Sequence, residues 1–239
     1  MLRFAVFAAL LVGLLVFVVF PLFAGSLIGS VLQGNGLRAQ SLTAQVGGSP
    51  LGLVTGRAEE LRLRGRDVEL GAGALAGTLD LTLGNVSLGD RSFSTVTGEL
   101  RDVLLRAADG ETARIQRLVL SGPAAAADAS AFLTAAESER LVLRAAVRGG
   151  VPLDGVRLTA GGVEATVGGI TAEGALSVRE GSLVVDAAGF LVPILIPADD
   201  LPFLLERVAV AADGVRVDGT IDVRALAGDA ALAGDAGPP

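Results

Sequence analysis

Apolar and polar residues alternate with a period of two along most of the chain beyond residue 60. The stretch ELRLRGRDVEL (60–70) alternates leucine with arginine, and GTLDLTLGNVSL (77–88) places the leucines at 79, 81 and 83 on one face. The same alternation marks ARIQRLVLSG, RLVLRAAVRG, VRLTAGGVEATVGG, ALSVREGSLVV and RVAVAADGVRVDGTIDV. Alternation at this density, broken by turns that contain glycine, is typical of half-buried antiparallel strands. The sequence therefore predicts a mainly antiparallel β domain.

One segment departs from this alternation. PAAAADASAFLTAAESER starts at Pro123 and is rich in alanine. Proline is favoured in the first turn of a helix and alanine has the highest helix propensity, so we expect a helix over residues 123–138. Phe132 and Leu133 would dock this helix, because an apolar sheet face must be covered by a second layer. The expected fold class is mainly β with one helix (α+β), with a long twisted antiparallel sheet wrapped around that helix.

The N-terminal stretch MLRFAVFAALLVGLLVFVVFPLF holds one charge, Arg3, followed by apolar residues from position 4 to 23. Twenty helical residues span about 30 Å, which is the hydrocarbon thickness of a bilayer. The positive charge before the run predicts that the N-terminus stays inside and the remainder is exported. A membrane anchor and a signal peptide cleaved after Ser26 are both open, although signal peptides have shorter apolar cores.

These patterns divide the chain into three parts. Residues 1–25 form the membrane anchor or signal segment, and residues 26–225 form the antiparallel β domain. Residues 226–239 contain mainly alanine, glycine, aspartate and proline, which predicts a disordered tail. We expect the β domain on the extracytoplasmic (periplasmic) side, anchored to the cell membrane, or exported after cleavage.

The missing residue types restrict the chemistry. The chain has no His, Cys or Lys, so it has no imidazole base, thiolate nucleophile or Schiff-base lysine. We expect no metal site and no cofactor. The net charge of −7 argues against nucleic acid as a partner, which requires a basic face, but leaves a membrane partner open.

Carboxylates are the remaining catalytic material, and Asp199-Asp200 is their most prominent pair. Paired carboxylates can perform acid–base chemistry or bind Mg²⁺. Because the pair lies between Pro197 and Pro202, it fits a solvated polar turn better than an active site. A carboxylate-dependent hydrolase or transferase remains a minor hypothesis.

Arginines cluster near residue 60. Arg57, Arg62 and Arg64 lie within eight residues, and the last two share one strand face. Guanidinium groups match phosphate geometry, so these three residues are candidates for binding lipid headgroups. The alternative is a solvated strand face balanced by the nearby acidic residues at 59, 60, 67 and 69.

The apolar run FLVPILIPADDLPF (190–203) contains three prolines, at positions 193, 197 and 202. Proline removes backbone donors, so an edge strand or a rim segment is expected here rather than a central strand. Its apolar residues can form either ordinary core or the wall or mouth of a lipid site. The candidate lipid-binding residues are Phe190, Leu191, Val192, Ile194, Leu195, Ile196, Leu201 and Phe203, together with Phe132.

Two stretches resemble the LmeA-like phospholipid-binding proteins of actinobacterial cell envelopes. Residues 49–88 share the Gly56-Arg57 pair, the LRLRGRDV strand and LDLTLGNVSL with the front half of that family. Residues 201–223, LPFLLERVAVAADGVRVDGTIDV, are similar to its closing strands. The resemblance implies a tubular lipid-binding fold like that of the bactericidal/permeability-increasing proteins, with a phospholipid in an apolar tunnel. It also implies a membrane-associated role in envelope lipid or lipoglycan maintenance or transport.

The function expected from these observations is non-enzymatic. The protein would bind a phospholipid, or a related envelope lipid, with its acyl chains in an apolar cavity of the β domain. The alternative is a structural or interaction module of the envelope with a solid core and no ligand.

Overall fold

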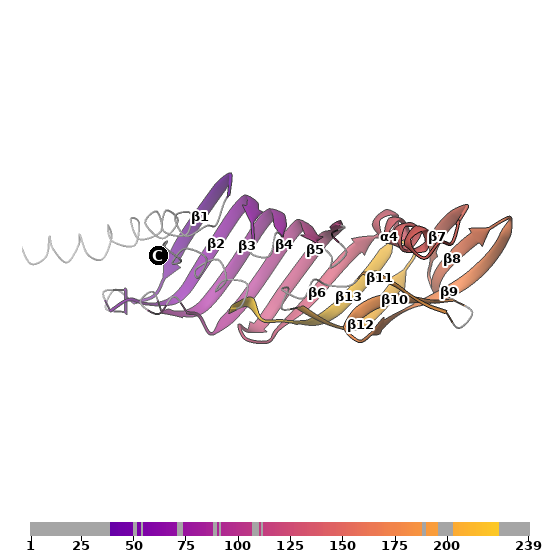
Figure 1. The fold of residues 1–239 in the computed structure, drawn as a ribbon. Helices are drawn as coiled ribbons and strands as arrows, with labels where there is room; N and C mark the ends of the chain where they lie inside the picture. The colour runs from indigo at the N-terminus through magenta and orange to yellow at the C-terminus, as the bar shows by residue number, and fades with distance from the viewer. Residues whose placement is uncertain are drawn as a thin grey trace, which may run out of the picture.

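The computed structural model describes residues 39–224 except 50–51, 54, 71–73, 88–89, 91, 107–109, 111, 188–189 and 196–202. This part of the chain contains two antiparallel sheets and one long helix, α4 (Figure 1). The elements are β1 (Ser41–Gly47), β2 (Arg57–Glu69), β3 (Leu75–Ser87), β4 (Thr95–Arg106), β5 (Thr112–Pro123), β6 (Ala127–Thr134), α4 (Ala135–Arg148), β7 (Gly155–Thr159), β8 (Gly162–Val167), β9 (Ile170–Arg179), β10 (Ser182–Ala187), β11 (Phe190–Leu195), β12 (Phe203–Ala211) and β13 (Gly214–Ile221).

The larger sheet has eight strands in the order β1-β2-β3-β4-β5-β6-β13-β12. Strands β1 to β6 follow one another as neighbours, and then the chain leaves through α4. It builds the second sheet, in the order β11-β10-β9-β8-β7, before β12 and β13 return to the first sheet beside β6. Figure 1 shows the long sheet extending from β1 to β12, with the second sheet at its far end.

The long strands bury one face and expose the other. In β3, which has 13 residues, Ala76, Leu79, Leu81, Leu83 and Val86 are buried. A strand of this length extends about 40 Å. Each long strand of the sheet therefore contributes several positions to a single apolar face.

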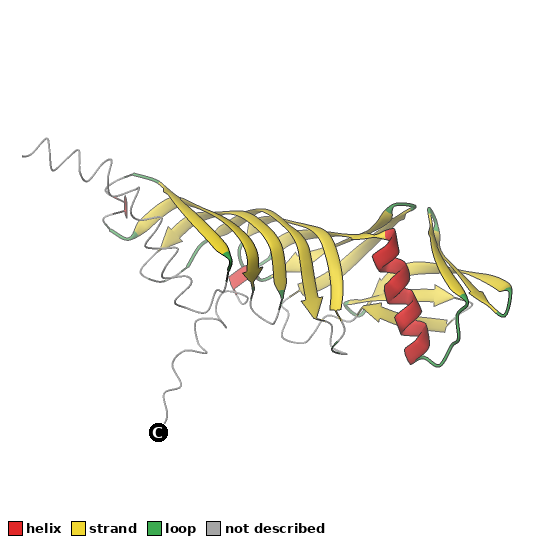
Figure 2. Cartoon of the chain, turned by 90° about the horizontal axis from the view of Figure 1, so that it is seen from above, coloured by secondary structure: helices red, strands yellow, loops and turns green. Residues whose placement is uncertain are grey.

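Irregularities shared by neighbouring strands keep the buried residues on that face. Asp67 and Asp102 have φ values of 49° and 51°, and both lie beside Gly77 in the middle strand. A Cβ on Gly77 would lie 3.0 Å from the Cβ of Asp102, so glycine permits the close approach. After Asp67 the spacing changes and Val68 returns to the buried side. Irregularities of this kind bend a strand and increase its twist, in agreement with the curved sheet in Figure 2.

The helix prediction was wrong in its boundaries. The segment expected to be helical over residues 123–138 forms the end of β5, a turn and β6, and the helix covers Ala135–Arg148. In β6, Ala127, Ala129, Ala131 and Leu133 are buried in strict alternation. The following stretch RLVLRAAVRG, predicted to be a strand, belongs almost entirely to α4. The local alanine content was overridden by pairing of β6 with both β5 and β13.

The N-terminus of α4 is capped by Thr134, whose Oγ1 accepts a hydrogen bond from the Glu137 backbone N–H at 3.2 Å. The buried residues of the helix recur at helical spacing on one face, at positions 138, 141, 142, 145 and 146. That face contacts β5, β6 and β13 in the large sheet and β7 and β11 in the small one. Figure 2 shows α4 at the junction of the two sheets.

The expected fold class is confirmed: the protein is mainly β, with antiparallel sheets and one long helix in the described part. Residues 1–25 and 226–239 lie outside the described residues, so the anchor and the tail stay predictions. Where residues are described, no helix has the length and hydropathy needed to span a membrane.

Candidate functional site

The large sheet presents a continuous apolar face. One row of residues runs directly across five paired strands, through Leu79, Leu100, Leu118, Ala131 and Val217. All five are buried and belong to the same core cluster. Within the large sheet, the substantial contacts of α4 are with β5, β6 and β13. The apolar face also includes β3 and β4, so it extends beyond the strands that the helix covers. An aliphatic face of this extent is chemically suited to acyl chains, and in this structure the side chains of the row are covered, each at most 7% exposed.

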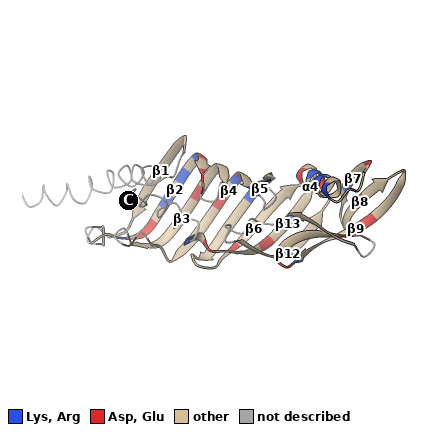
Figure 3. Ribbon diagram, in the orientation of Figure 1, with Lys and Arg blue, Asp and Glu red and all other residues tan. Residues whose placement is uncertain are grey.

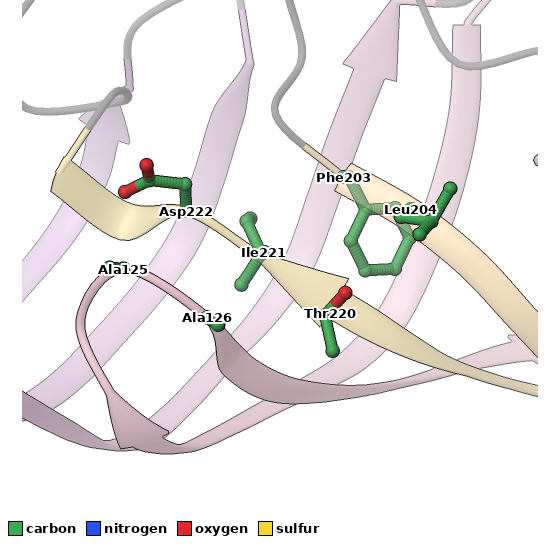
Figure 4. Close-up of a pocket in the computed structure, with 7 residues that line it drawn as sticks. All are labelled: Ala125, Ala126, Phe203, Leu204, Thr220, Ile221 and Asp222. Carbon is green, nitrogen blue, oxygen red and sulfur yellow. The ribbon is translucent and has the colours of Figure 1, made fainter.

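A pocket of about 370 Å³ opens at one end of β12 and β13 (Figure 4). Most of its wall is apolar, with the Thr220 hydroxyl and the Asp222 carboxylate as its polar side-chain groups. Its volume is at the lower end of the range for small-molecule sites. The lining residues are Ala125, Ala126, Phe203, Leu204, Thr220, Ile221 and Asp222.

The pocket is formed by three segments that are distant in sequence. Ala125 and Ala126 belong to the turn between β5 and β6, whereas Phe203 starts β12. Phe203 pairs directly with Ile221, and Ile221 pairs with Ala127 of β6. Strand pairing therefore brings a phenyl ring, a branched aliphatic side chain and small residues together. Among the predicted lipid-binding residues whose side chains the structure describes, Phe203 lines this pocket.

The remaining residues of the 190–203 run have different environments. Pro193 lies in β11, which is an edge strand of the small sheet, as the prolines predicted. Ile194 and Leu195 are buried in the core cluster, Val192 is partly buried against it, and Leu191 is 52% exposed. The core interpretation therefore fits Ile194 and Leu195.

Other predicted positions in this run are not described. Phe190 begins β11, but its side chain is outside the description. Ile196, Leu201 and the Asp199-Asp200 pair fall in the gap at residues 196–202. Their assignment to a lipid site, and that of the aspartates to a turn, stays a prediction.

Phe132 does not dock a helix on the sheet. It lies in β6 at a position that alternates with the buried alanines, so it is on the polar face. Its ring packs against Gly214, where an added Cβ would be 2.6 Å from the ring Cζ atom. The direct cross-strand neighbours of Phe132 are Arg117 and Arg216.

Arg62 and Arg64 are half-exposed on the same polar face and share one carboxylate. Figure 3 shows basic and acidic positions on neighbouring strands of the large sheet. Arg62 donates two hydrogen bonds of 3.1 Å to Asp80, and the Nε atom of Arg64 lies 3.1 Å from Asp80 Oδ2. The hydrogen bond from Arg62, aided by the charge of Arg64, lowers the pKa of Asp80, while Asp80 raises the pKa of Arg62. Their charge is thus balanced mainly across strands by Asp80, with a smaller contribution from Glu60 beside Arg62 on the pKa of that arginine.

Arg57 begins β2 and is exposed. A role in headgroup binding stays a prediction for it, and also for Arg62 and Arg64. The two latter guanidinium groups lie on the face opposite the apolar side chains and already bind Asp80.

Glu99 occupies the equivalent position on the next strand pair. It receives hydrogen bonds from Arg101 and from Arg117, and the Arg101 bond is the main cause of its lowered pKa. Asp80 and Glu99 face each other across β3 and β4. Both carboxylates are therefore ionised in structural ion pairs, and neither has the raised pKa of a general acid. In the described ranges no three acidic residues form a group that could hold a metal ion.

The sequence did not indicate Ala125, Ala126 or Thr220 as site residues. Small side chains contribute to a pocket by leaving space, and no local pattern marks that role. The closing stretch GTIDV (219–223), which contains Thr220, Ile221 and Asp222, indicates a strand and does not mark these residues as a site.

A family model described as LmeA-like phospholipid-binding matches residues 18–220. The match covers α4, both sheets except the last residue of β13, and five of the seven pocket residues; Ile221 and Asp222 follow it. Comparisons with curated proteins and with solved structures found no match.

Proposed function

Because the chain belongs to the LmeA-like phospholipid-binding family, we propose that it holds a phospholipid non-covalently, without converting it chemically. The main support from the structure is the apolar face, which runs across the paired strands of the large sheet beyond the reach of α4. The absence of His, Cys and Lys supports a non-enzymatic role. So does the engagement of Asp80 and Glu99 in ion pairs.

We assign the entry of the acyl chain to the pocket between β12, β13 and the β5–β6 turn. Phe203, Leu204 and Ile221 offer apolar contact to the chain. Thr220 and Asp222 lie at the polar side, where a headgroup would remain hydrated. An acidic rim favours a headgroup that carries a hydroxyl or ammonium donor over a bare phosphate.

We further propose that the domain acts on the extracytoplasmic side of the cell membrane, in envelope lipid or lipoglycan maintenance or transport. The support is Arg3 followed by the apolar run at residues 4–23, together with the family. Anchoring would keep the lipid-binding domain close to the bilayer that supplies its ligand.

Two leucines provide a matched test of the pocket. Leu204 lines the pocket and is 56% exposed, while Leu191 is 52% exposed outside it; each lies on an edge strand. Both tolerate a polar substitution at similar cost because neither is in the core. We expect native mass spectrometry of the purified chain to show bound phospholipid. Leu204→Asp should lower lipid content and uptake at least several-fold. Leu191→Asp tests a residue that the sequence suggested for lipid binding but that lies outside the pocket, and on the pocket assignment it should leave both unchanged.

Two outcomes would overturn parts of this assignment. A wild-type chain that is empty and takes up no labelled phospholipid would refute lipid binding and favour the solid-core module. Lipid content that is unaffected by Leu204→Asp would refute the pocket as the entry site.

A further inference from the structure

Exposed aliphatic side chains gather at the end of the molecule that is remote from β1. Val147 and Ile170 are 74% and 75% exposed, and Val151 and Val167 are 43% and 39% exposed. Val147 lies near the end of α4 and Val151 follows it, whereas Val167 and Ile170 flank the turn of the β8–β9 hairpin. Figure 1 shows this hairpin at the opposite end of the protein from β1. We call these four residues the apolar tip.

The hairpin end is built without charge. Gly168 and Gly169 form its two-residue turn with φ values of 56° and 81°, conformations that suit a tight hairpin. Val167 pairs with Ile170 directly beside the turn. The whole stretch ATVGGITA (165–172) contains no ionisable residue. Turns exposed to water normally carry polar side chains, so this composition is a poor fit to free solvent.

The two halves of the apolar tip are connected by Asp154. Its backbone N–H donates to the Thr166 carbonyl at 2.7 Å, and its carboxylate accepts from the Gly169 N–H at 3.3 Å. On the helix side, the Val151 N–H donates to the Ala146 carbonyl at 2.9 Å. Asp154 is also the only charged residue between positions 149 and 156, and its charge is directed to the turn backbone. On the hairpin side the exposed aliphatics therefore stand on a fixed surface with little charge, whereas on the helix side the exposed Arg148 lies directly beside Val147.

We propose that the apolar tip inserts into the interfacial region of a phospholipid bilayer. This goes beyond lipid binding in the pocket, because it assigns a membrane contact to described residues, in addition to the one predicted for residues 1–25. Burying one such side chain fully removes roughly 60–120 Å² from water. Given their exposures, the four side chains present on the order of 150–300 Å². A stable protein interface needs about 800 Å² per partner, so the patch is too small and too convex for one.

A bilayer fits this surface better than a second protein. Apolar groups on a protruding element can enter the boundary between headgroups and acyl chains without a complementary partner surface. Arg148 flanks the apolar tip on the helix side, but the four inserting side chains carry no charge, so their insertion does not itself require anionic lipid. We therefore expect it to occur on phosphatidylcholine vesicles and to be insensitive to salt.

The absence of tryptophan from the chain makes the test direct. In the full chain reconstituted into phosphatidylcholine vesicles, Ile170→Trp introduces the only indole. A second reporter, Val147→Trp, examines the helix side of the apolar tip. The control is Leu75→Trp, at a 37% exposed position of β3 in the large sheet that belongs to neither the pocket nor the apolar tip. We expect blue-shifted emission and at least two-fold quenching by lipids brominated in the acyl chains for both reporters, and neither effect for the control.

The proposal is overturned if the reporters keep solvent-like emission on vesicle-bound protein, or if the control is quenched equally. A blue shift without vesicles that depends on protein concentration would indicate a second copy of the chain and would also overturn it. Lipid content, measured on the same variants, tests the pocket separately. A chain that contains lipid but has unquenched reporters refutes only the insertion, and an empty chain refutes only lipid binding.

Discussion

The residue at the boundary between β6 and α4 gives a quantitative prediction. Thr134 is the last residue of β6, with extended backbone angles, and its side chain caps the helix by accepting from the Glu137 N–H. Thr134→Ala removes this acceptor and leaves a helix N–H without its partner. Loss of an N-cap typically costs about 1 kcal/mol, within a range of roughly 0.5–2 kcal/mol.

For a chain of this size, about 1 kcal/mol corresponds to a fall in Tm of roughly 2–4 °C. Circular dichroism during heating measures the Tm, and urea unfolding gives the free energy directly. The matched control is Thr134→Ser, which retains the hydroxyl acceptor. The bond from Ser138 Oγ to the Thr134 backbone carbonyl does not depend on the residue 134 side chain and is unchanged in both variants.

We expect Thr134→Ser to stay within a few tenths of a kcal/mol of the wild type. Equal losses for Ala and Ser would show that side-chain packing, and not the cap, causes the effect. An unchanged Tm for Thr134→Ala would mean that the capping bond contributes nothing and that tertiary contacts alone fix the start of the helix.

Three further predictions concern charge, burial and backbone. The pKa values of Asp80 and Glu99 are lowered in the folded protein, so their ion pairs stabilise it above about pH 4 and this stabilisation is lost as the pH falls below that value. When urea unfolding is measured from pH 6 to 2.5, the urea midpoint of Asp80→Asn should therefore decrease less than that of the wild type. Ser177 has a buried Oγ without a hydrogen-bond partner in the described part, so Ser177→Ala should leave stability unchanged or raise it by about 1 kcal/mol in chemical unfolding. Gly98→Ala would place its Cβ against the Asp80 carbonyl and 2.8 Å from the backbone of β3, at a cost of about 2–4 kcal/mol, whereas Gly150→Ala meets no atom within 4 Å and should cost about 1 kcal/mol.

The strands could be predicted from the sequence because most of them have one solvent-exposed face and one buried face. In β3 and β5 the buried leucines and the exposed polar residues differ strongly in hydropathy, so the period is visible. In β6 the buried positions at 127, 129 and 131 are alanines, which favour a helix intrinsically and contrast weakly with their neighbours. Its strand conformation depends on β13, whose paired residues lie 80 to 94 positions later. The residues of β6 and their chain neighbours therefore cannot indicate that β6 pairs with β13.

The opposite error was the prediction of a strand for the second half of α4. Signals in the nearby sequence could have corrected it. RLVLRAAVRG fits both a period of two and a period of 3.6, so hydropathy alone cannot decide. The Thr134–Glu137 spacing is the first half of a capping box, and Gly149 closes the helix at the other end. The capping residues at the two ends of α4 therefore predict the helix better than the hydropathy pattern of the residues between them.

The pocket shows why the site could be predicted only in part. Phe203 is large, apolar and part of a proline-rich run, so its neighbourhood attracted attention from sequence. Ile221 and Ala127 are ordinary strand residues that become relevant because they lie in one row with Phe203 across β12, β13 and β6. The register of three strands determines that row, and small residues beside it keep the space open. A lipid site of this kind is a property of strand pairing rather than of any motif, which is why its residues are found together only in the folded chain.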